Sequence, residues 1–161
     1  GYHKEDKLLL TGQQGDVMQE SMKCARTMAR RILKRECPEL YEAEDFSTGL
    51  HIHCPATSTP KDGPSAGGAI CLAIFSYLSN RGLKTDVAMT GEIDLYGNIT
   101  AIGGLEAKLN GAKRAGIHLA LIPAENEEQL LRLRKRGTSA ESEDFKVVMV
   151  SHINEAMKYI L

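Results

Sequence analysis

Hydrophobic positions recur along the chain at two different spacings, and these spacings predict its helices and strands. Residues 17–37 place apolar side chains at helical spacing behind Asp16, so we expect a long amphipathic helix with Asp16 at its N-cap. Residues 49–54 alternate apolar and polar side chains, which predicts a strand. Residues 65–80 are apolar on nearly every side, which predicts a buried helix that is closed by Gly82.

The rest of the chain continues the alternation of strands with helices. We expect strands at 7–12, 118–124 and 145–150, two strands within 87–102 around a Gly97–Asn98 turn, and helices at 104–116, 125–137 and 154–161, with Pro38 ending the first helix. This alternation predicts an α/β or α+β fold, in which helices pack on a mixed sheet. The 161 residues are enough for a single domain, residues 1–161, with a full core.

The composition is that of an ordinary globular protein and argues against several other classes. Apolar residues make up 42% and charged residues 25%, which excludes a disordered chain. The net charge of −1 gives no sign of a nucleic-acid or membrane partner, no apolar run reaches the roughly 18 residues of a membrane span, and the opening residues lack the apolar core of a signal peptide. Because the four cysteines form no CxxC pair, we expect reduced thiols in the cytoplasm or an equivalent reducing compartment such as the mitochondrial matrix.

The stretch TPKDGPSAGG, residues 59–68, carries the candidate chemistry. Ser65 stands where the predicted buried helix begins, and three interpretations of this serine are open. A serine N-cap satisfies a free N–H of the first helical turn, but a cap does not explain the glycines and prolines around it. A Gly-rich loop before a helix can also cradle a phosphate, and a serine in such a loop can be a nucleophile.

The phosphate interpretation lacks the most specific motif. A P-loop needs a Gly–Lys pair, which this sequence does not contain, whereas a looser loop like that of the GHMP small-molecule kinases stays open. Asp62 and Asp94 are the only nearby candidates for holding magnesium, and they form no clear pair. A kinase-like domain that binds a nucleotide is therefore the alternative class of function.

The nucleophile interpretation needs a base elsewhere in the chain. Residues 63–67 match the G-x-S-x-G of a nucleophile elbow, but roughly ten residues separate Ser65 from the strand that ends at Cys54, so the tight turn of an elbow is missing. Lys108 offers a different base, because it falls in the apolar arc of the helix predicted at 104–116. Either this lysine snorkels to solvent, or burial lowers its pKa below about 10.4 and leaves a neutral amine that can take the serine proton.

Four segments of the chain resemble one known family. They are PKDGPSAGG, TGEIDLYGNITAIGGLEAKLNGAKRAGI, LLLTGQQGDVMQES and LIPAENE, and the resemblance runs from about Leu8 to the C-terminus. In this order and at this spacing they resemble the proteolytic domain of the Lon family of ATP-dependent serine proteases. The resemblance implies the Lon proteolytic-domain fold, with Ser65 as the nucleophile and Lys108 as its base. These are the two residues that the helix pattern also singles out.

The resemblance further implies roles for residues beside this dyad. Thr90, in the Thr-Gly-Glu motif, supports the lysine amine, although a β-branched residue is also ordinary in a strand. Asp62 lies beside the nucleophile and changes with the active or inactive state of its loop. Backbone N–H groups around the serine hold the oxyanion, in a region formed by the other motif residues Gly63, Pro64 and Ala66.

The sequence departs from the family pattern at three positions. Gly68 stands where the family usually has a larger apolar residue, Ala107 where it has glutamate, and Thr57 where it has glycine. None of the three removes a catalytic group. They bear on the rigidity of the first helical turn and on the shape of the substrate groove.

The resemblance implies a serine endopeptidase domain that hydrolyses unfolded or damaged proteins. Such a domain is coupled to an AAA+ ATPase module on the same polypeptide and works in a hexameric ring, so we expect residues 1–161 to be a fragment without that N-terminal module. No cofactor or metal is expected at the site, because ATP and magnesium belong to the ATPase module. The alternatives are the kinase-like nucleotide binder and an inactive Lon-like domain that serves only in assembly.

Three further features are not assigned a function. His51 and His53 share a strand face without a third zinc ligand. The basic run at 132–136 follows an acidic helix start, which favours a solvated surface over a nucleic-acid patch. Cys71 lies in the predicted buried helix and is expected to pack in the core.

Overall fold

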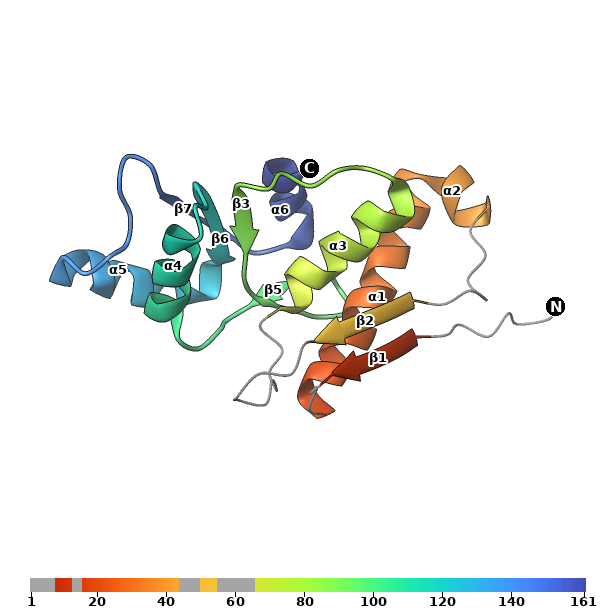
Figure 1. Ribbon diagram of the computed structural model, residues 1–161, viewed down its shortest axis with the longest axis horizontal. Coiled ribbons are helices and arrows are strands. Elements are labelled where there is room, and N and C mark those ends of the chain that lie inside the picture. The colour runs from red at the N-terminus through yellow and green to blue at the C-terminus, as the bar shows by residue number, and fades with distance from the viewer. Residues whose placement is uncertain (1–7, 13–15, 44–49, 55–65) are drawn as a thin grey trace.

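The computed structural model describes residues 8–12, 16–43, 50–54 and 66–161, and strands alternate with helices through most of this part of the chain (Figure 1). The elements in chain order are β1 (Leu8–Gly12), α1 (Asp16–Glu36), α2 (Pro38–Ala43), β2 (Leu50–Cys54), α3 (Gly67–Ser79), β3 (Val87–Met89), β4 (Glu92–Ile93), β5 (Ile99–Thr100), α4 (Leu105–Arg114), β6 (Leu119–Pro123), the 3-10 helix η2 (Ala124–Asn126), α5 (Glu127–Arg136), β7 (Lys146–Val150) and α6 (Ile153–Ile160).

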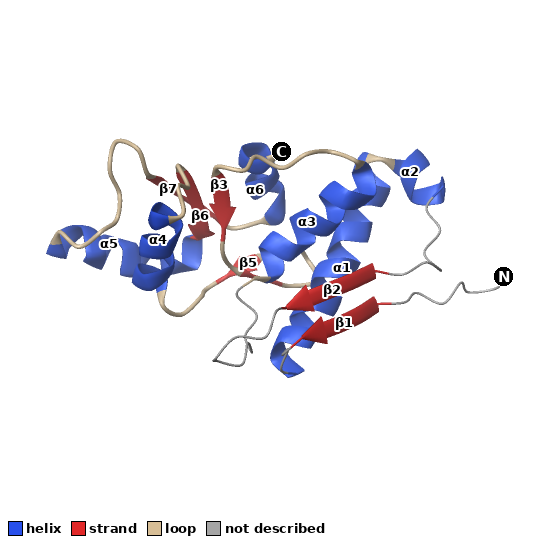
Figure 2. Cartoon of the chain, in the orientation of Figure 1, coloured by secondary structure: helices blue, strands red, loops and turns tan. Residues whose placement is uncertain are grey.

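The described strands pair into three small sheets. β1 pairs with β2 in parallel, and β3, β6 and β7 form a parallel sheet with β6 at its centre, whereas β4 and β5 form an antiparallel hairpin. Parallel neighbours need a crossover connection, and helices supply it, with α4 between β3 and β6 and α5 between β6 and β7 (Figure 2). The predicted α/β fold is confirmed, with the parallel and antiparallel pairings in separate sheets.

The β3-β6-β7 sheet separates two hydrophobic clusters. Leu119 and Leu121 of β6 face one cluster, while Ala120 and Ile122 face the other, because successive side chains of a strand point to opposite faces. We call the first cluster the α3 core, and its buried members are Ala25, Met28, Ala29, Ile32, Leu33, Cys71, Leu72, Ile74, Phe75, Leu78, Ile93, Ile99, Leu121, Val150, Ile153, Ala156 and Ile160. The second is the α4 core, formed by Ile102, Leu105, Leu109, Ala120, Ile122, Leu130, Leu133, Ala140 and Phe145.

α3 is the buried helix that the sequence predicts. It packs along α1 and contributes Cys71, Leu72 and Phe75, which are fully buried. Its C-terminus differs from the prediction, because Asn80 and not Gly82 closes it. Asn80 adopts the left-handed conformation with φ of 56° and donates its backbone N–H to the Ser76 carbonyl. Asparagine reaches this conformation at lower cost than most other residues, so the glycine two positions later is not needed as a cap.

Three other predicted boundaries change. Pro38 does not simply end the first helix, since after a one-residue break it begins α2, and proline is favoured at the first helical position because its missing N–H needs no partner there. The segment 87–102 holds three short strands, β3, β4 and β5. The turn between β4 and β5 spans Asp94–Gly97, so it begins earlier in the chain than the predicted Gly97–Asn98 turn. The helix predicted at 125–137 is divided into η2 and α5. None of the helices that the structure describes is long and apolar enough to span a bilayer.

Candidate active site

The start of α3 packs closely against its neighbours. α3 begins at Gly67 with Ala66 at its N-cap, and the Gly68 N–H donates to the Gly91 carbonyl at 3.1 Å. A Cβ on Gly67 would lie 2.7 Å from the Ser21 Oγ, closer than side chains normally approach. Ala66 has no polar side chain and makes no side-chain cap, so among the described residues the helix start is held by this packing and by backbone bonds.

Gly68 departs from the family pattern without leaving an empty space. A Cβ at Gly68 would lie 2.6 Å from the Met89 Cε and 3.2 Å from the Ile99 Cδ1. The Met89 side chain therefore occupies volume that a larger residue at position 68 would need. Where the family usually has a larger residue at this position of α3, the Met89 side chain of β3 fills the space beside the first turn.

The Thr90–Gly91 segment joins the start of α3 to the parallel sheet. The Thr90 N–H donates to the Leu121 carbonyl of β6 at 3.0 Å, and the next residue accepts the bond from Gly68. Gly91 has a φ of +141°, and a Cβ there would lie 2.5 Å from the Ile99 Cγ2. Only glycine meets both conditions, so this residue lets the chain that leaves β3 pass close to Ile99 of β5 and accept a bond from the start of α3.

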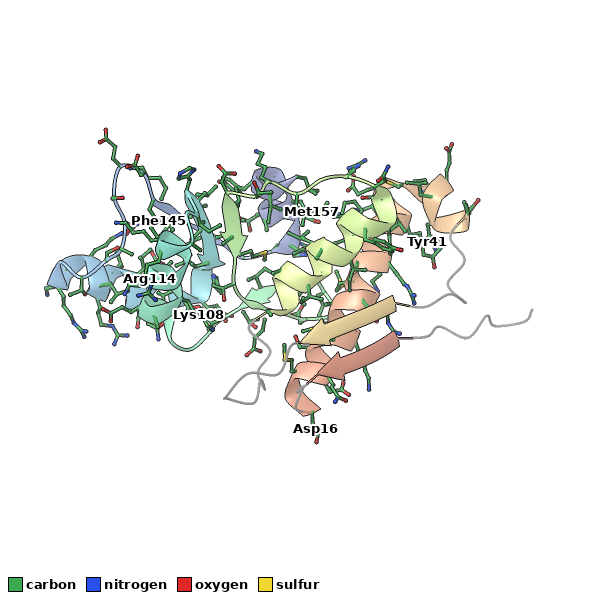
Figure 3. All side chains as sticks on the ribbon, in the orientation of Figure 1. Asp16, Tyr41, Lys108, Arg114, Phe145 and Met157 are labelled. Carbon is green, nitrogen blue, oxygen red and sulfur yellow. The ribbon has the colours of Figure 1, made fainter. Side chains whose placement is uncertain are left out.

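Lys108 lies on α4 (Figure 3), and its N–H donates to the Gly104 carbonyl at 3.1 Å. Its side chain is exposed, which agrees with the first of the two open interpretations, a lysine whose ammonium reaches solvent from the apolar arc. Leu105 and Leu109 make the contact with the α4 core, and Lys108 lies at the edge of that arc, about 100° from Leu109. The pKa of Lys108 is nevertheless lowered from its ordinary value by partial desolvation of the ammonium, because part of the side chain rests against apolar walls.

Lys108 and Thr90 line the same cavity of about 210 Å³, between α4 and strands β3 and β6. Its other lining residues are all apolar, namely Ala88, Met89, Leu109, Ala112, Ala120, Leu121 and Ile122. Met89 also approaches Gly68, so the cavity lies next to the first turn of α3. The structure thus brings a lysine and a threonine to one apolar pocket beside the helix start that follows Ser65 in the chain.

The predicted site residues fall into two groups. Ser65, Asp62, Gly63 and Pro64 lie outside the described residues, as does Thr57. Ala66, Thr90 and Lys108 are described: Ala66 is the N-cap of α3, and the other two share the cavity.

Of the two aspartates considered for magnesium binding in a kinase-like domain, Asp94 is among the described residues and Asp62 is not. The Asp94 carboxylate accepts hydrogen bonds within its own turn. It accepts the N–H groups of Tyr96 and Asn98 at 2.9 and 2.8 Å and the Asn98 Nδ2 at 3.0 Å. Burial acts to raise its pKa, but the bonds from Asn98, Tyr96 and Gly97 outweigh burial and lower the pKa below its ordinary value. Among the residues that the structure describes, no group of three or more His, Cys, Asp or Glu could hold a metal ion.

The features that were not assigned a function behave as follows. Cys71 is fully buried in the α3 core, and burial raises the pKa of its thiol to about 12, so the predicted packing role is confirmed. In the basic run at 132–136, Leu133 faces the α4 core and the charged residues are exposed. Exposure fits a solvated surface and a nucleic-acid patch equally, so the interpretation as a solvated surface stays a prediction. The side chains of His51 and His53 lie outside the described part of the chain.

Sequence reasoning missed two side chains near the site, Glu125 and Asn126. Both follow the end of β6 and bind the backbone of residues 101–102, just before α4. The acidic start of the helix predicted at 125–137 agrees with the helix dipole and so gives no reason to expect other partners. The available signal was the burial of the preceding strand, because a polar residue directly after a buried strand needs a partner inside the fold.

Comparison with known proteins identifies one family. The family model described as "Lon protease (S16) C-terminal proteolytic domain" matches residues 2–161. The Lon protease of Vibrio parahaemolyticus is 43% identical over 157 residues, which cover 96% of this chain and 19% of that protein. The Lon protease of Escherichia coli is 48% identical over 126 residues, covering 77% and 16% respectively. The chain therefore spans about a fifth or less of the length of these curated relatives.

Proposed function

The chain belongs to the family of Lon protease C-terminal proteolytic domains, and we propose that it is a serine endopeptidase domain with a dyad of Ser65 and Lys108. One observation carries the proposal. Thr90 and Lys108 line one apolar cavity beside the first turn of α3, the helix that begins two residues after Ser65. An amine against apolar walls loses its proton more readily, as a general base for a serine must.

The proposed chemistry uses Lys108 first as base and then as acid. The neutral amine takes the proton from the Ser65 hydroxyl while the serine oxygen attacks the peptide carbonyl. The resulting ammonium gives that proton to the leaving amine, and an acyl-enzyme forms. Water then attacks the acyl group with Lys108 again as base, which releases the second product and restores the serine. Thr90 supports the amine, and Asp62 acts beside the nucleophile according to the state of its loop.

The oxyanion is proposed to bind backbone N–H groups at the start of α3. Helix N-termini present N–H groups without intrahelical partners, and they carry partial positive charge. The Gly68 N–H donates to Gly91 and so is not a candidate. The proposed donors are the N–H groups of Ala66 and Gly67, with Gly63 and Pro64 shaping the loop ahead of them.

The wider role is also a proposal. We expect unfolded or damaged proteins as substrates, an AAA+ ATPase module on the same polypeptide, and a hexameric ring. ATP and magnesium would then act in the ATPase module, and no cofactor would act at the dyad. The three described thiols, Cys24, Cys37 and Cys71, are unpaired, which agrees with the cytoplasm or another reducing compartment such as the mitochondrial matrix.

The test is active-site labelling with a fluorophosphonate, followed by intact-mass measurement and a peptide-cleavage assay. The parent chain should gain one adduct and cleave the peptide, whereas Ser65→Ala should do neither. Because Ala66 and not Ser65 is the N-cap of α3, this variant should melt close to the parent. Cleavage by Ser65→Ala at the parental rate would rule out the nucleophile.

The same experiment separates the alternatives. An inactive assembly module predicts no adduct and no cleavage in the parent either. A kinase-like domain predicts that ATP raises the melting temperature of the isolated chain, since a ligand that binds only the folded state stabilises it. The hydrogen bonds that occupy the Asp94 carboxylate count against that alternative.

A further inference from the structure

The segment that leads into α4 is held by two side chains of η2, the 3-10 helix that follows β6. The Ala101 N–H donates to the Glu125 Oε2 at 2.8 Å. The Ile102 N–H donates to the Asn126 Oδ1 at 3.0 Å, and the Asn126 Nδ2 donates back to the Ile102 carbonyl at 2.9 Å. We call these three bonds the Asn126 clamp. The amide of Asn126 imitates a neighbouring strand, since it pairs with both backbone groups of one residue.

Asn126 is used for this clamp and not for capping its own helix. It occupies the N-cap position of α5, where asparagine usually accepts a bond from the first turn, but its side chain makes no such bond. It is only 2% exposed, and its Nδ2 also donates to the Oε1 of the exposed Gln129 at 2.8 Å. The two bonds to Ile102 are costly to remove, because the groups left unpaired there are buried and stay without water, whereas water can replace the exposed Gln129 acceptor.

Apart from the packing of Ile102 and Leu105 in the α4 core, the start of the helix that carries Lys108 has no side-chain cap to hold it. Gly103 and Gly104 separate the clamp from α4, and a Cβ on either would meet nothing within 4 Å. Gly104 is the N-cap with φ of 67° and offers no side-chain cap. Lys108 binds this same turn through its N–H to the Gly104 carbonyl, so its position follows the direction in which the chain enters the helix.

The two polar residues that line the cavity, Thr90 and Lys108, are both positioned by hydrogen bonds that lead to β6 or to the residues after it. Thr90 is tied to that strand by its bond to the Leu121 carbonyl, and the entry to α4 is tied to the residues that follow the strand. We propose that Asn126 is a positioning residue that sets the entry of α4 and thereby holds the Lys108 amine opposite Thr90 and the start of α3. The catalytic part of this inference rests on the proposed peptidase function, whereas its structural part does not.

The kinetic test compares variants of the clamp with matched controls. Asn126→Leu keeps the branched shape of the side chain and removes both bonds between Asn126 and Ile102, so kcat for peptide cleavage should fall by about 10- to 100-fold with little change in KM, the size expected for a misplacement near 1 Å. The pH midpoint of kcat should also rise, because Lys108 leaves the apolar walls that lower its pKa. Gln129→Ala, which removes only the bond to Gln129, should retain parental values of both.

Two further variants distinguish a loss of activity that is due to the clamp from one that is due to lower stability of the fold. Ile160→Ala deletes a buried side chain of α6 in the α3 core, and it should lower the melting temperature without moving the pH midpoint. Glu125→Ala removes one exposed acceptor and should lower kcat about two- to tenfold, whereas Glu125→Gln retains an oxygen there and should restore the rate. An unchanged kcat and pH midpoint in both Asn126→Leu and Glu125→Ala would overturn the catalytic role.

Hydrogen exchange tests the clamp without any activity. The Lys108 amide, bonded to Gly104, should exchange at least about tenfold faster in Glu125→Ala and Asn126→Leu than in the parent, and at the parental rate in Gln129→Ala and Glu125→Gln. Equal exchange in all variants would overturn the proposal. If the parent does not cleave peptides, the peptidase function fails, and faster exchange in the clamp variants would still support the role of Asn126 in holding α4.

Discussion

α3 and α4 carry the two halves of the proposed dyad and are held in the fold in different ways. α3 has eight buried residues among its 13 and lies inside the α3 core between α1 and the sheet. α4 has two buried residues among its ten, Leu105 and Leu109, and covers the opposite face of the sheet from outside. In Figure 1 the two helices lie in different parts of the molecule, with β3 between them.

This difference shows two solutions to the problem of placing a reactive group. A helix that is apolar on nearly every side is located by packing along its whole length, and its end can then hold a loop without further support. A surface helix has one apolar face and is located more weakly, so its end needs particular hydrogen bonds. The start of α3 accordingly depends on close-packed glycines, and the start of α4 depends on the Asn126 clamp.

Removal of the amine from α4 should have the largest effect. Lys108→Met should lower kcat by about 10²- to 10⁴-fold, the usual contribution of a general base, and Lys108→Arg should do the same because guanidinium stays protonated. Steady-state peptide cleavage by both variants is the measurement. Since the side chain is exposed, both should melt within a few degrees of the parent. Near-parental activity in Lys108→Arg would remove the dyad and leave only the fold in common with the family.

The pH dependence of cleavage should follow the proton of Lys108. The pKa of the amine is lowered by desolvation, and only the neutral amine is a base, so activity should rise about tenfold per pH unit and level off below the ordinary lysine pKa near 10.4. The sign for stability is the same. The folded state binds the proton less tightly than the unfolded state, so this group adds stability as pH rises from its folded to its unfolded pKa.

A lysine that titrates at its ordinary value would contradict this prediction. Nuclear magnetic resonance of the labelled lysine side chain measures the pKa directly, with Lys108→Met to assign the signal. Lys113, on the same helix and bonded to the Ala140 carbonyl, provides an internal comparison.

Glycine-to-alanine changes should separate the two helices by sign. Gly67→Ala in α3 should lower the free energy of unfolding by about 1–3 kcal/mol, because its Cβ would lie 2.7 Å from the Ser21 Oγ and 3.2 Å from the Ile93 nitrogen. Gly111→Ala in α4 should raise it by about 0.5–1 kcal/mol, because nothing lies within 4 Å and alanine favours a helix. Urea denaturation measures both, and equal effects would contradict the contrast in packing.

The C-terminus of α3 should also give only a small effect. Asn80→Ala should lower the free energy of unfolding by about 1 kcal/mol, because alanine enters the left-handed conformation less readily. Asn80→Gly should keep or slightly raise it. Thermal melting of the pair gives the difference, and an alanine variant as stable as the glycine variant would show that the chain closes α3 in another way.

The sequence by itself determined the features that depend on local periodicity and on motif. The all-round apolar pattern of residues 65–80 predicts a buried helix, and α3 is one. The alternation of strands and helices predicts the α/β fold, and the segments PKDGPSAGG and GGLEAK predict the family. The motifs indicate Ser65 and Lys108, and Lys108 is also marked by its place in the apolar arc of its helix.

Only the tertiary structure decided how far that lysine is exposed and what surrounds it. A helical wheel gives the direction of a side chain but not what covers it, so it could not show that α4 is a surface helix with Lys108 at its edge. Nor could it show that Met89 fills the space beside Gly68, or that Asn126 leaves its helix cap to bind Ile102. Each of these contacts joins residues far apart in the chain. Such contacts depend on how the whole fold packs, because the local sequence pattern does not indicate which distant residues will meet.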